Sequence, residues 1–327
     1  MKAVVHKKYG PPNTLQIEEV EKPIPSDNEV LVKIYATSVN RTDCATVRGI
    51  PFLTRVGTGI FRPKIQISGS EFAGVVEETG ENVTFLKKGD KVFGFDDQGL
   101  KSHAEYMKIS EEKAFSIPQN ISFEQAAVSI EGAHYAYNFI NKVDLKTGQR
   151  VLVNGATGAI GSSAVQLLKY YEAHVTAVCS GEHMDLVKSL GADEVIDYTR
   201  EDFTKIDQKF QFVFDTVGKS SFFKCRPILE NGGVYISSDL GYRAQNLFLP
   251  FITPFIKSLF ENKKTVFPFP SNIKRSILLI RKLIEEEKFQ AVVDRKYALK
   301  DILEAYRYVE EGQKLGNVVV KVLEKNE

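Results

Sequence analysis

Three glycines separate an apolar run from a segment with helical spacing, in the sequence VNGATGAIGSSAVQLLK at 153–169. Glycine at 155 permits a backbone conformation that other residues avoid, and glycine at 158 leaves room for a phosphate beside the backbone. Glycine at 161 allows the helix to pack closely on the strand, and N–H groups at a helix start favour a pyrophosphate. We therefore predict a dinucleotide-binding turn, rather than a merely structural strand-to-helix turn, formed by Gly155, Ala156, Thr157, Gly158, Ala159, Ile160 and Gly161.

The end of the next apolar run, HVTAVC at 174–179, should select the form of the cofactor. An acidic residue at that end binds the ribose hydroxyls of NAD and repels a 2′-phosphate. Here the run is followed by Ser180, a small neutral hydrogen-bond donor, which favours NADPH and leaves NADH as the alternative. Glu182 favours NADH if its carboxylate faces the ribose, whereas His183 and Arg200 are either phosphate ligands or ordinary surface charges.

The elements that would position this turn differ between the two parts of the chain. Residues 1 to about 120 hold short β-prone runs divided by Gly and Pro, which predicts a small barrel or sandwich. From 121 onward strands and helices alternate, which predicts βαβ units and a parallel sheet. The expected strands are 29–39, 72–80, 90–95, 104–109, 150–155, 174–179, 194–198, 210–218, 233–238 and 317–323, and the expected helices are 122–143 with Ser122 as its N-cap, one from about 159, 183–190, 220–229, 271–289 and 299–313.

Composition narrows the class of protein. The 327 residues suggest about two domains, and a formal net charge of +1 argues against a nucleic-acid partner. Cys44, Cys179 and Cys225 lie far apart, so we expect no disulfide framework and a reducing compartment, the cytoplasm. The N-terminus lacks the long apolar run of a signal peptide. The most apolar segment, 247–260, is too short and too broken by Pro and Lys to cross a bilayer, so we expect no membrane partner.

Seven motifs then follow one another along the chain: SVNRTDCATVRG (38–49), ISGSEFAGVVEETGENV (67–83), KKGDKVFG (87–94), VLVNGATGAIGSSAVQLLK (151–169), LGADEVIDY (190–198), FVFDTVG (212–218) and EEGQKLGNVVVKV (310–322). In this order they resemble the zinc-independent, quinone-oxidoreductase-like branch of the medium-chain dehydrogenase/reductase superfamily. The resemblance covers essentially the whole chain and implies an α/β fold, in which a Rossmann-like parallel-sheet domain is inserted into a GroES-like β-barrel catalytic domain. The implied boundaries are 1–120 for the first part of the catalytic domain, 121–265 for the Rossmann NAD(P)-binding domain and 266–327 for the return to the catalytic domain.

The resemblance also implies roles for single residues. Tyr198 and His183 match positions that contact the adenosine 2′-phosphate in relatives, and Asn317 matches one near the nicotinamide. Asn40 and Asp43 match residues that line the active-site cleft, where Asp43 either accepts backbone hydrogen bonds or acts as a base. The implied cofactor residues are therefore those of the glycine turn with Ser180, His183, Tyr198, Val217 and Asn317, and the implied catalytic residues are Asn40, Thr42, Asp43 and His134.

The same resemblance indicates whether the chain should bind a catalytic zinc ion. Zinc-dependent relatives would carry a cysteine ligand at Asn40 and a histidine ligand at Ser70, and neither side chain present here binds zinc well. We therefore expect no metal. Alcohol oxidation then loses the Lewis acid that assists it, whereas reduction of an activated acceptor needs less help. Hydride addition to such an acceptor leaves a delocalised oxyanion, which polar donors such as Asn40, Thr42 or His134 can stabilise.

The sequence thus predicts an enzyme, an NADPH-dependent oxidoreductase that transfers hydride to quinones or α,β-unsaturated carbonyls without a metal. Its partner would be a small-molecule substrate. The alternatives are an alkenal or enoyl double-bond reductase and an NADPH-binding regulatory protein with little turnover, and a zinc alcohol dehydrogenase is disfavoured. The stretch 242–271 resembles a segment that closes over the cofactor and, through an edge strand at 263–269, pairs the subunits of a homodimer; plain core packing is the other interpretation.

Overall fold

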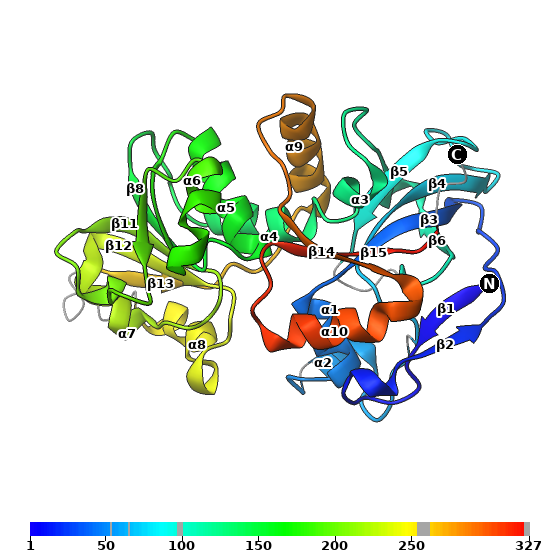
Figure 1. The fold of residues 1–327 in the computed structure, drawn as a ribbon, viewed down its shortest axis with the longest axis horizontal. Coiled ribbons are helices and arrows are strands. Elements are labelled where there is room, and N and C mark those ends of the chain that lie inside the picture. Colours follow the sequence, from blue (N-terminus) through cyan, green and yellow to red (C-terminus); the bar gives the residue numbers. More distant parts are fainter. Residues whose placement is uncertain (53, 65, 97–100, 254–261, 324–327) are drawn as a thin grey trace. The chain divides into compact units, whose positions relative to one another are not determined.

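The computed structural model describes residues 1–323 apart from 53, 65, 97–100 and 254–261. The chain divides into two compact units (Figure 1). Unit 1 comprises Met1–Glu131 and Ile273–Glu327, and unit 2 comprises Gly132–Asn272. Unit 2 is therefore inserted between two segments of unit 1, as the resemblance implied.

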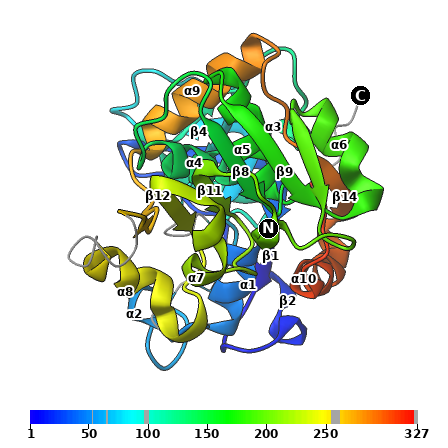
Figure 2. The ribbon, with the colours of Figure 1, turned by 90° about the vertical axis from the view of Figure 1, so that its left-hand side faces the viewer.

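Unit 2 is built on a six-stranded sheet in the order β10-β9-β8-β11-β12-β13, and every neighbouring pair is parallel (Figure 1 and Figure 2). After β8 the chain adds β9 and β10 on one side of β8, and it then adds β11, β12 and β13 on the other side. In such sheets ligands bind at the carboxyl ends of the strands where the order reverses. The strands are β8 (Arg150–Asn154), β9 (His174–Cys179), β10 (Glu194–Asp197), β11 (Phe210–Asp215), β12 (Leu229–Ser237) and β13 (Lys264–Val266).

Helices cover this sheet because its strands are apolar on both faces. Helix α5 packs against β8 and β9, and α6 packs against β9 and β10. Helix α7 packs against β12 and α8 against β13. The helices are α4 (Glu131–Ile140), α5 (Ala159–Tyr170), α6 (Met184–Ser189), α7 (Phe222–Cys225) and α8 (Gln245–Ile252), with 3-10 turns at Gly181–His183, Phe203–Lys205, Arg226–Ile228 and Tyr242–Ala244.

Unit 1 is β-rich, as expected from its short β-prone runs. A seven-stranded sheet runs β14-β15-β3-β4-β5-β7, with β6 paired to β3, and β1 and β2 form an antiparallel pair. The long strand β3 reproduces the expected residues 29–39 and pairs antiparallel with β4, β6 and β15. The strands are β1 (Lys2–Val5), β2 (Gln16–Glu19), β3 (Glu29–Val39), β4 (Glu71–Thr79), β5 (Lys91–Phe95), β6 (Tyr106–Ser110), β7 (Phe115–Ser116), β14 (Val293–Ala298) and β15 (Asn317–Lys321).

Two helices of unit 1 from opposite ends of the chain share one core. Helix α1 follows β3 directly, and its buried side chains Cys44 and Val47 pack with Tyr306 and Val309 of α10. Cys44 is thus a packed core residue. The helices are α1 (Arg41–Arg48), α2 (Thr54–Thr58), α3 (Phe123–Ala126), α9 (Ile273–Glu285) and α10 (Ile302–Glu311), with 3-10 turns at Pro12–Thr14, Glu111–Lys113 and Leu299–Asp301.

The expected helix at 122–143 is in fact two helices, α3 and α4. Ser122 caps α3 as expected, since its side chain accepts a hydrogen bond of 3.2 Å from Gln125 N–H. The helix stops because the N–H groups of Ile130 and Glu131 donate to the carboxylate of Glu71 instead of to helical carbonyls. A carboxylate distant in sequence therefore overrides the local helical pattern.

The boundaries of the units lie beyond the expected positions 120 and 265. The segment before Glu131 belongs to unit 1, since the ring of Phe123 stacks on Tyr35 of β3 with centroids 4.8 Å apart. The expected helix at 220–229 is a short α7 followed by a 3-10 turn that contains Pro227, because proline has no N–H group to continue the helical hydrogen bonds.

The apolar segment 247–260 is only partly described, and 254–261 lie outside the described residues. Its first part forms α8, which ends at Ile252. Among the described residues, none of the helices combines the length and the apolar character that crossing a membrane requires.

Candidate functional site

The glycine turn of unit 2 has the geometry that its sequence predicts. Gly155 has a φ of 81°, and a Cβ there would lie 2.3 Å from Val217 Cγ1. A Cβ at Gly161 would lie 2.1 Å from the carbonyl oxygen of Gly155, so the start of α5 packs on the turn too closely for any side chain. At Gly158 the nearest atom to a Cβ is 3.6 Å away, so this side of the turn is open.

The start of α5 provides donors for an anion. Ser162 N–H donates to Gly158 O at 2.8 Å, which is the first bond of the helical ladder. The three preceding N–H groups, those of Ala159, Ile160 and Gly161, have no acceptor within the helix, because the first turn of any helix leaves such donors. The open face at Gly158 and these donors fit a pyrophosphate. The residues present therefore fit the dinucleotide that the sequence predicts.

Behind the turn lies a buried carboxylate that the sequence analysis did not single out. Asp215, the last residue of β11, accepts hydrogen bonds from Asn154 Nδ2 at 2.9 Å and from the hydroxyl of Tyr235 at 2.8 Å. It also accepts N–H bonds from Gly218 and Ser220, both at 3.1 Å. Asp215 thereby fixes the loop that carries Val217 against the glycine turn. An acidic residue that ends an apolar run, as in FVFD, is the signal that would have indicated it.

The carboxyl ends of β9 and β10 bring together the residues expected to choose between NADPH and NADH. Ser180 follows β9, and Tyr198 N–H donates to Cys179 O at 3.1 Å, so Ser180 and Tyr198 lie on adjacent strand ends. Glu182 accepts from Ser180 Oγ at 3.4 Å and lies 3.4 Å from His183 Nε2. The carboxylate of Glu182 thus lies close to both side chains while it stays largely exposed.

A second acid, Asp197, lies beside these residues. A Cβ on Gly181 would lie 2.3 Å from Asp197 Oδ2, so a side chain there would displace this carboxylate. Asp197 accepts from the hydroxyl of Thr199 at 2.7 Å and from its N–H at 2.9 Å, and these bonds lower the pKa of Asp197. Arg200 pairs with the same carboxylate at 3.5 Å. Asp197 is therefore ionised and engaged in its own turn.

His134 lies in α4 of unit 2 and is completely buried. Its Nε2 is 3.3 Å from Asn138 Nδ2, which also donates to His134 O at 2.8 Å. Burial lowers the pKa of His134 to about 4, so the imidazole is neutral at pH 7. Asn138 in turn accepts from Ser271 N–H at 3.1 Å. The ring is thus held as a neutral group within unit 2.

In unit 1, Asn40 and Asp43 form a reciprocal cap at the start of α1. Asn40 Oδ1 accepts from Asp43 N–H at 2.8 Å, and Asp43 Oδ2 accepts from Asn40 N–H at 3.0 Å. The amide of Asn40 also donates to Ser70 Oγ at 2.9 Å. The two positions at which zinc-dependent relatives would carry metal ligands are thus joined by a hydrogen bond, and Asp43 accepts the backbone bond expected of it.

Next to this cap lies a second buried hydrogen-bond system. Glu71 Oε1 accepts the N–H groups of Glu131 at 2.7 Å and of Ile130 at 3.1 Å, and its Oε2 accepts from Ser38 Oγ at 2.8 Å. Glu131 Oε1 is 2.8 Å from Thr42 Oγ1. Three buried carboxyl groups, those of Asp43, Glu71 and Glu131, therefore lie in one cluster that α1, β4 and the start of α4 assemble.

These carboxyl groups cannot all be ionised together. Burial raises the pKa of Asp43 and that of Glu71. Burial, followed by the charges of Glu71 and Asp43, raises the pKa of Glu131 well above its ordinary value. The compensating cation is Lys314, whose ammonium donates to Gly316 O and whose pKa is lowered by burial and sustained by Glu131, Asp294 and Glu71. The cluster therefore holds at least one proton at neutral pH.

The sequence analysis missed Glu71, Glu131 and Lys314, which come from segments far apart in the chain. Glu71 and Glu131 are isolated acids in otherwise apolar stretches, GSEFAGVV and SIEGAHYAY, and this isolation is a usable signal. Lys314 carries no comparable signal, because lysines in loops are common. Asn317, expected near the nicotinamide, lies in unit 1 at the start of β15, where its N–H donates to Val292 O at 2.8 Å.

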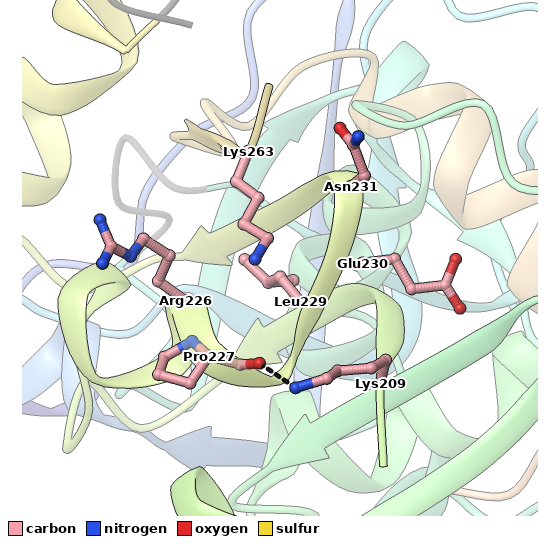
Figure 3. A pocket seen from close by; sticks show the side chains of 7 residues that line it. All are labelled: Lys209, Arg226, Pro227, Leu229, Glu230, Asn231 and Lys263. Carbon is pink, nitrogen blue, oxygen red and sulfur yellow. Dashed lines mark hydrogen bonds between the residues drawn. The ribbon is translucent and has the colours of Figure 1, made fainter. Parts of the chain in front are cut away.

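A further pocket of about 650 Å³ lies in unit 2 away from the glycine turn (Figure 3). Its lining comes from the amino ends of β11, β12 and β13, whereas the turn is at the carboxyl end of β8. Lys209 Nζ donates to Pro227 O at 2.5 Å across it. The pocket is therefore separate from the predicted cofactor site.

No group of three or more His, Cys, Asp or Glu side chains suited to a metal ion occurs in the described part of the chain.

Unit 2, with its open glycine turn on a parallel sheet, is inserted between the two segments of the β-rich unit 1. This arrangement is typical of NAD(P)-dependent oxidoreductases that consist of a dinucleotide-binding domain and a β-rich domain. Two family descriptions match the chain, "Alcohol dehydrogenase GroES-like domain" over residues 26–119 and "Zinc-binding dehydrogenase" over residues 190–320. The chain belongs to the quinone-oxidoreductase-like branch of the medium-chain dehydrogenase/reductase superfamily. It is an NAD(P)H-dependent oxidoreductase, so the predicted family, fold class and enzyme class are confirmed.

Three relatives illustrate the match. The chloroplast envelope quinone oxidoreductase homolog of Arabidopsis thaliana is 30% identical over 98% of this chain and 98% of its own. The NADPH-dependent alkenal/one oxidoreductase of the same plant, a chloroplastic protein, is 29% identical over 98% of this chain and 79% of its own. The structure of the quinone oxidoreductase from Coxiella burnetii superposes with a TM-score of 0.84 at 27% identity, over 99% of both chains.

Proposed function

We propose that the protein is an NADPH-dependent reductase of quinones or α,β-unsaturated carbonyls that works without a metal. The observation that carries this proposal is the open turn at Gly158, which fits a pyrophosphate at the start of α5. Relatives are named quinone oxidoreductase and NADPH-dependent alkenal/one oxidoreductase, which supports both the cofactor and the acceptor class. When bound, NADPH supplies a hydride to the acceptor.

The preference for NADPH rests on Ser180. Its hydroxyl is a neutral donor at the end of β9, where an acidic side chain would repel a 2′-phosphate. Glu182 accepts a hydrogen bond from Ser180, and Asp197 is engaged by Thr199 and Arg200. His183, Tyr198 and Arg200 are then the proposed contacts of the phosphate.

The acceptor needs one proton after it has received the hydride, because its oxygen becomes an anion. We assign the proton to the carboxyl group of Glu131, which burial keeps protonated. In the structure the hydroxyl of Thr42 donates to Glu131 Oε1 at 2.8 Å. When the carboxyl group is protonated, this bond reverses, and the hydroxyl proton of Thr42 is then free to pass to the acceptor oxygen. Solvent returns a proton to Glu131. Asn40 and Asp43 position Thr42 by capping α1, and His134 contributes as a neutral hydrogen-bonding group.

The absence of a metal from the reaction is supported by the bond between Asn40 and Ser70, which commits both side chains to each other. Elemental analysis of the purified protein tests this point. One equivalent of zinc that is lost together with activity on chelation would overturn it.

Steady-state oxidation of NADPH with a panel of quinones and enones tests the function. A quinone yields a hydroquinone and an enone yields a saturated ketone, so product analysis separates the quinone reductase from the double-bond reductase. If NADPH binds and no acceptor is turned over, the protein is a binding module and the reductase proposal fails.

A homodimer and a cytoplasmic location complete the proposal. Strand β13 has a partner only on the β12 side among the described strands, so its other edge is available for pairing with a second subunit. Size-exclusion chromatography with light scattering tests the dimer.

The proposed cytoplasmic location rests on the cysteines. Cys44, Cys179 and Cys225 are all buried free thiols, which suits a reducing compartment.

A further inference from the structure

An apolar surface lies in unit 1 on the segment between α1 and β4. Single exposed apolar side chains are ordinary, but a dense run of them marks an interaction surface. Within residues 50–61 five large apolar side chains are exposed, and that of Phe61 is 93% exposed. The five are Ile50, Phe52, Val56, Ile60 and Phe61.

Contacts with the rest of unit 1 hold the backbone of this surface in place. The hydroxyl of Tyr9 lies 2.7 Å from Thr58 Oγ1 and donates to Gly59 O at 2.6 Å. Arg55 Nε donates to Gly49 O at 2.9 Å, and the guanidinium stacks on the ring of Tyr9 at 4.6 Å. The apolar side chains therefore project from an anchored backbone.

The charge of this segment differs from that of the whole chain. Residues 44–70 contain four cations and no Asp or Glu, although the full chain has a formal net charge of only +1. Arg48 is neutralised by Glu310, with Nη2 and Oε2 2.7 Å apart. Among the described residues, no carboxylate forms an ion pair with the other three cations, which are Arg55, Arg62 and Lys64.

We propose that the surface formed by Ile50, Phe52, Val56, Ile60, Phe61, Arg62 and Lys64 binds an anionic lipid bilayer. Exposed Phe, Ile and Val side chains enter the boundary between headgroups and acyl chains, and Arg and Lys contact the lipid phosphates. A neutral occupant, such as a second apolar surface or an uncharged acceptor, would cover the apolar side chains and leave the exposed cations Arg62 and Lys64 without a counter-charge. Charge complementarity therefore favours the anionic bilayer.

The sequence analysis expected no membrane partner because the whole chain is nearly neutral and its most apolar run, 247–260, is too short to cross a bilayer. The segment 50–64 escapes that criterion, since Arg, Thr and Gly interrupt it. This inference does not depend on the proposed reductase, because lipid binding is measured without turnover.

Cosedimentation of the full chain with vesicles tests the inference. We expect binding to vesicles of phosphatidylcholine with phosphatidylglycerol, and weaker binding at high salt or with phosphatidylcholine alone. The double variant Phe52→Ser/Phe61→Ser and the double variant Arg62→Gln/Lys64→Gln should each reduce the partition coefficient by about tenfold or more.

Two matched controls should retain binding. Phe85 is 84% exposed outside the surface, so Phe85→Ser removes an equivalent ring, and Lys88→Gln removes an exposed charge in the same loop. Unchanged thermal unfolding shows that each variant is folded. Equal sedimentation of wild type and the Phe52/Phe61 variant overturns the proposal. So does a change of oligomeric state in that variant, which would identify a second copy as the occupant.

Discussion

The hydroxyl of Thr42 lies 2.8 Å from a carboxyl oxygen of Glu131, the first residue of α4. The two residues are far apart in the sequence, and Glu131 reaches this position because Glu71 binds the N–H group of Glu131 at 2.7 Å. One carboxylate thus orients another, and their proximity favours a protonated form of Glu131.

The first prediction concerns turnover and pH. Because the pKa of Glu131 is raised, its proton is present below that raised pKa and is lost as pH rises through it. We expect kcat to fall on the alkaline side, and Glu131→Gln to lower kcat by about a hundredfold and to remove that limb. NADPH affinity, measured by fluorescence titration, should stay unchanged. A variant with the wild-type pH profile would show that Glu131 does not supply the proton.

The second prediction concerns stability and the same group. A carboxyl group whose pKa is raised in the folded state destabilises the protein as the pH rises above the pKa of the same group in the unfolded state. The unfolding free energy of wild type relative to Glu131→Gln should therefore fall, by at most about 1.4 kcal/mol per pH unit, from pH 4.5 up to the folded pKa. Asp43, Glu71, Lys314, Asp294 and Arg41 also face the cluster, and the difference between wild type and variant reports the titration of Glu131 together with its effect on these groups. Urea unfolding at several pH values measures the difference, and a flat difference would contradict the raised pKa.

The third prediction separates two glycines of the turn. Gly161→Ala places a Cβ 2.1 Å from Gly155 O and should destabilise the protein by about 1–3 kcal/mol in thermal or urea unfolding. Gly158→Val should leave the fold intact, since a Cβ there meets nothing closer than 3.6 Å, and should abolish NADPH binding. Unchanged NADPH affinity in the folded Gly158→Val protein would refute the pyrophosphate site.

The fourth prediction concerns the choice of cofactor. Ser180→Asp introduces a negative charge where the 2′-phosphate is proposed to bind, and like charges in contact cost several kcal/mol. The ratio of NADPH to NADH affinity should fall by at least about tenfold. The control is Ser189→Asp, an exposed position at the end of α6. If both variants keep the wild-type ratio, Ser180 is not the selecting residue.

The fifth prediction concerns the cap of α1. Asn40→Ala removes the acceptor of Asp43 N–H and the donor to Ser70, so we expect a loss of about 2–4 kcal/mol in unfolding free energy. Ser122→Ala removes a single capping bond from α3 and should cost about 1 kcal/mol. Equal losses in the two variants would show that the bond to Ser70 contributes nothing.

Local sequence patterns predicted much of the fold because their signals are local. The apolar run at 29–39 is β3, the run at 174–179 is β9, and the spacing of Gly155 and Gly161 anticipates two contacts that exclude a side chain. The pairing of Glu71 with Glu131 was not predictable in this way. It depends on which strand end meets which helix start, and that information lies in the tertiary structure.

The residues expected to act together were recovered only in part. Ser180 and Tyr198 lie on adjacent strand ends, and Asn40, Thr42 and Asp43 lie at the start of one helix. The roles of His134 and Asn317 stay predictions, since each is bonded to its own neighbours in its own unit.

The double duty of Asn40 also restricts how this protein can change through evolution. Its side chain caps α1 and holds Ser70, so the stability of unit 1 depends on an amide at this position. A single mutation to cysteine would introduce a thiol at this position, while removing the cap and leaving Ser70 without this donor. Any variant of this chain with a metal-binding side chain at position 40 therefore starts from a less stable unit 1.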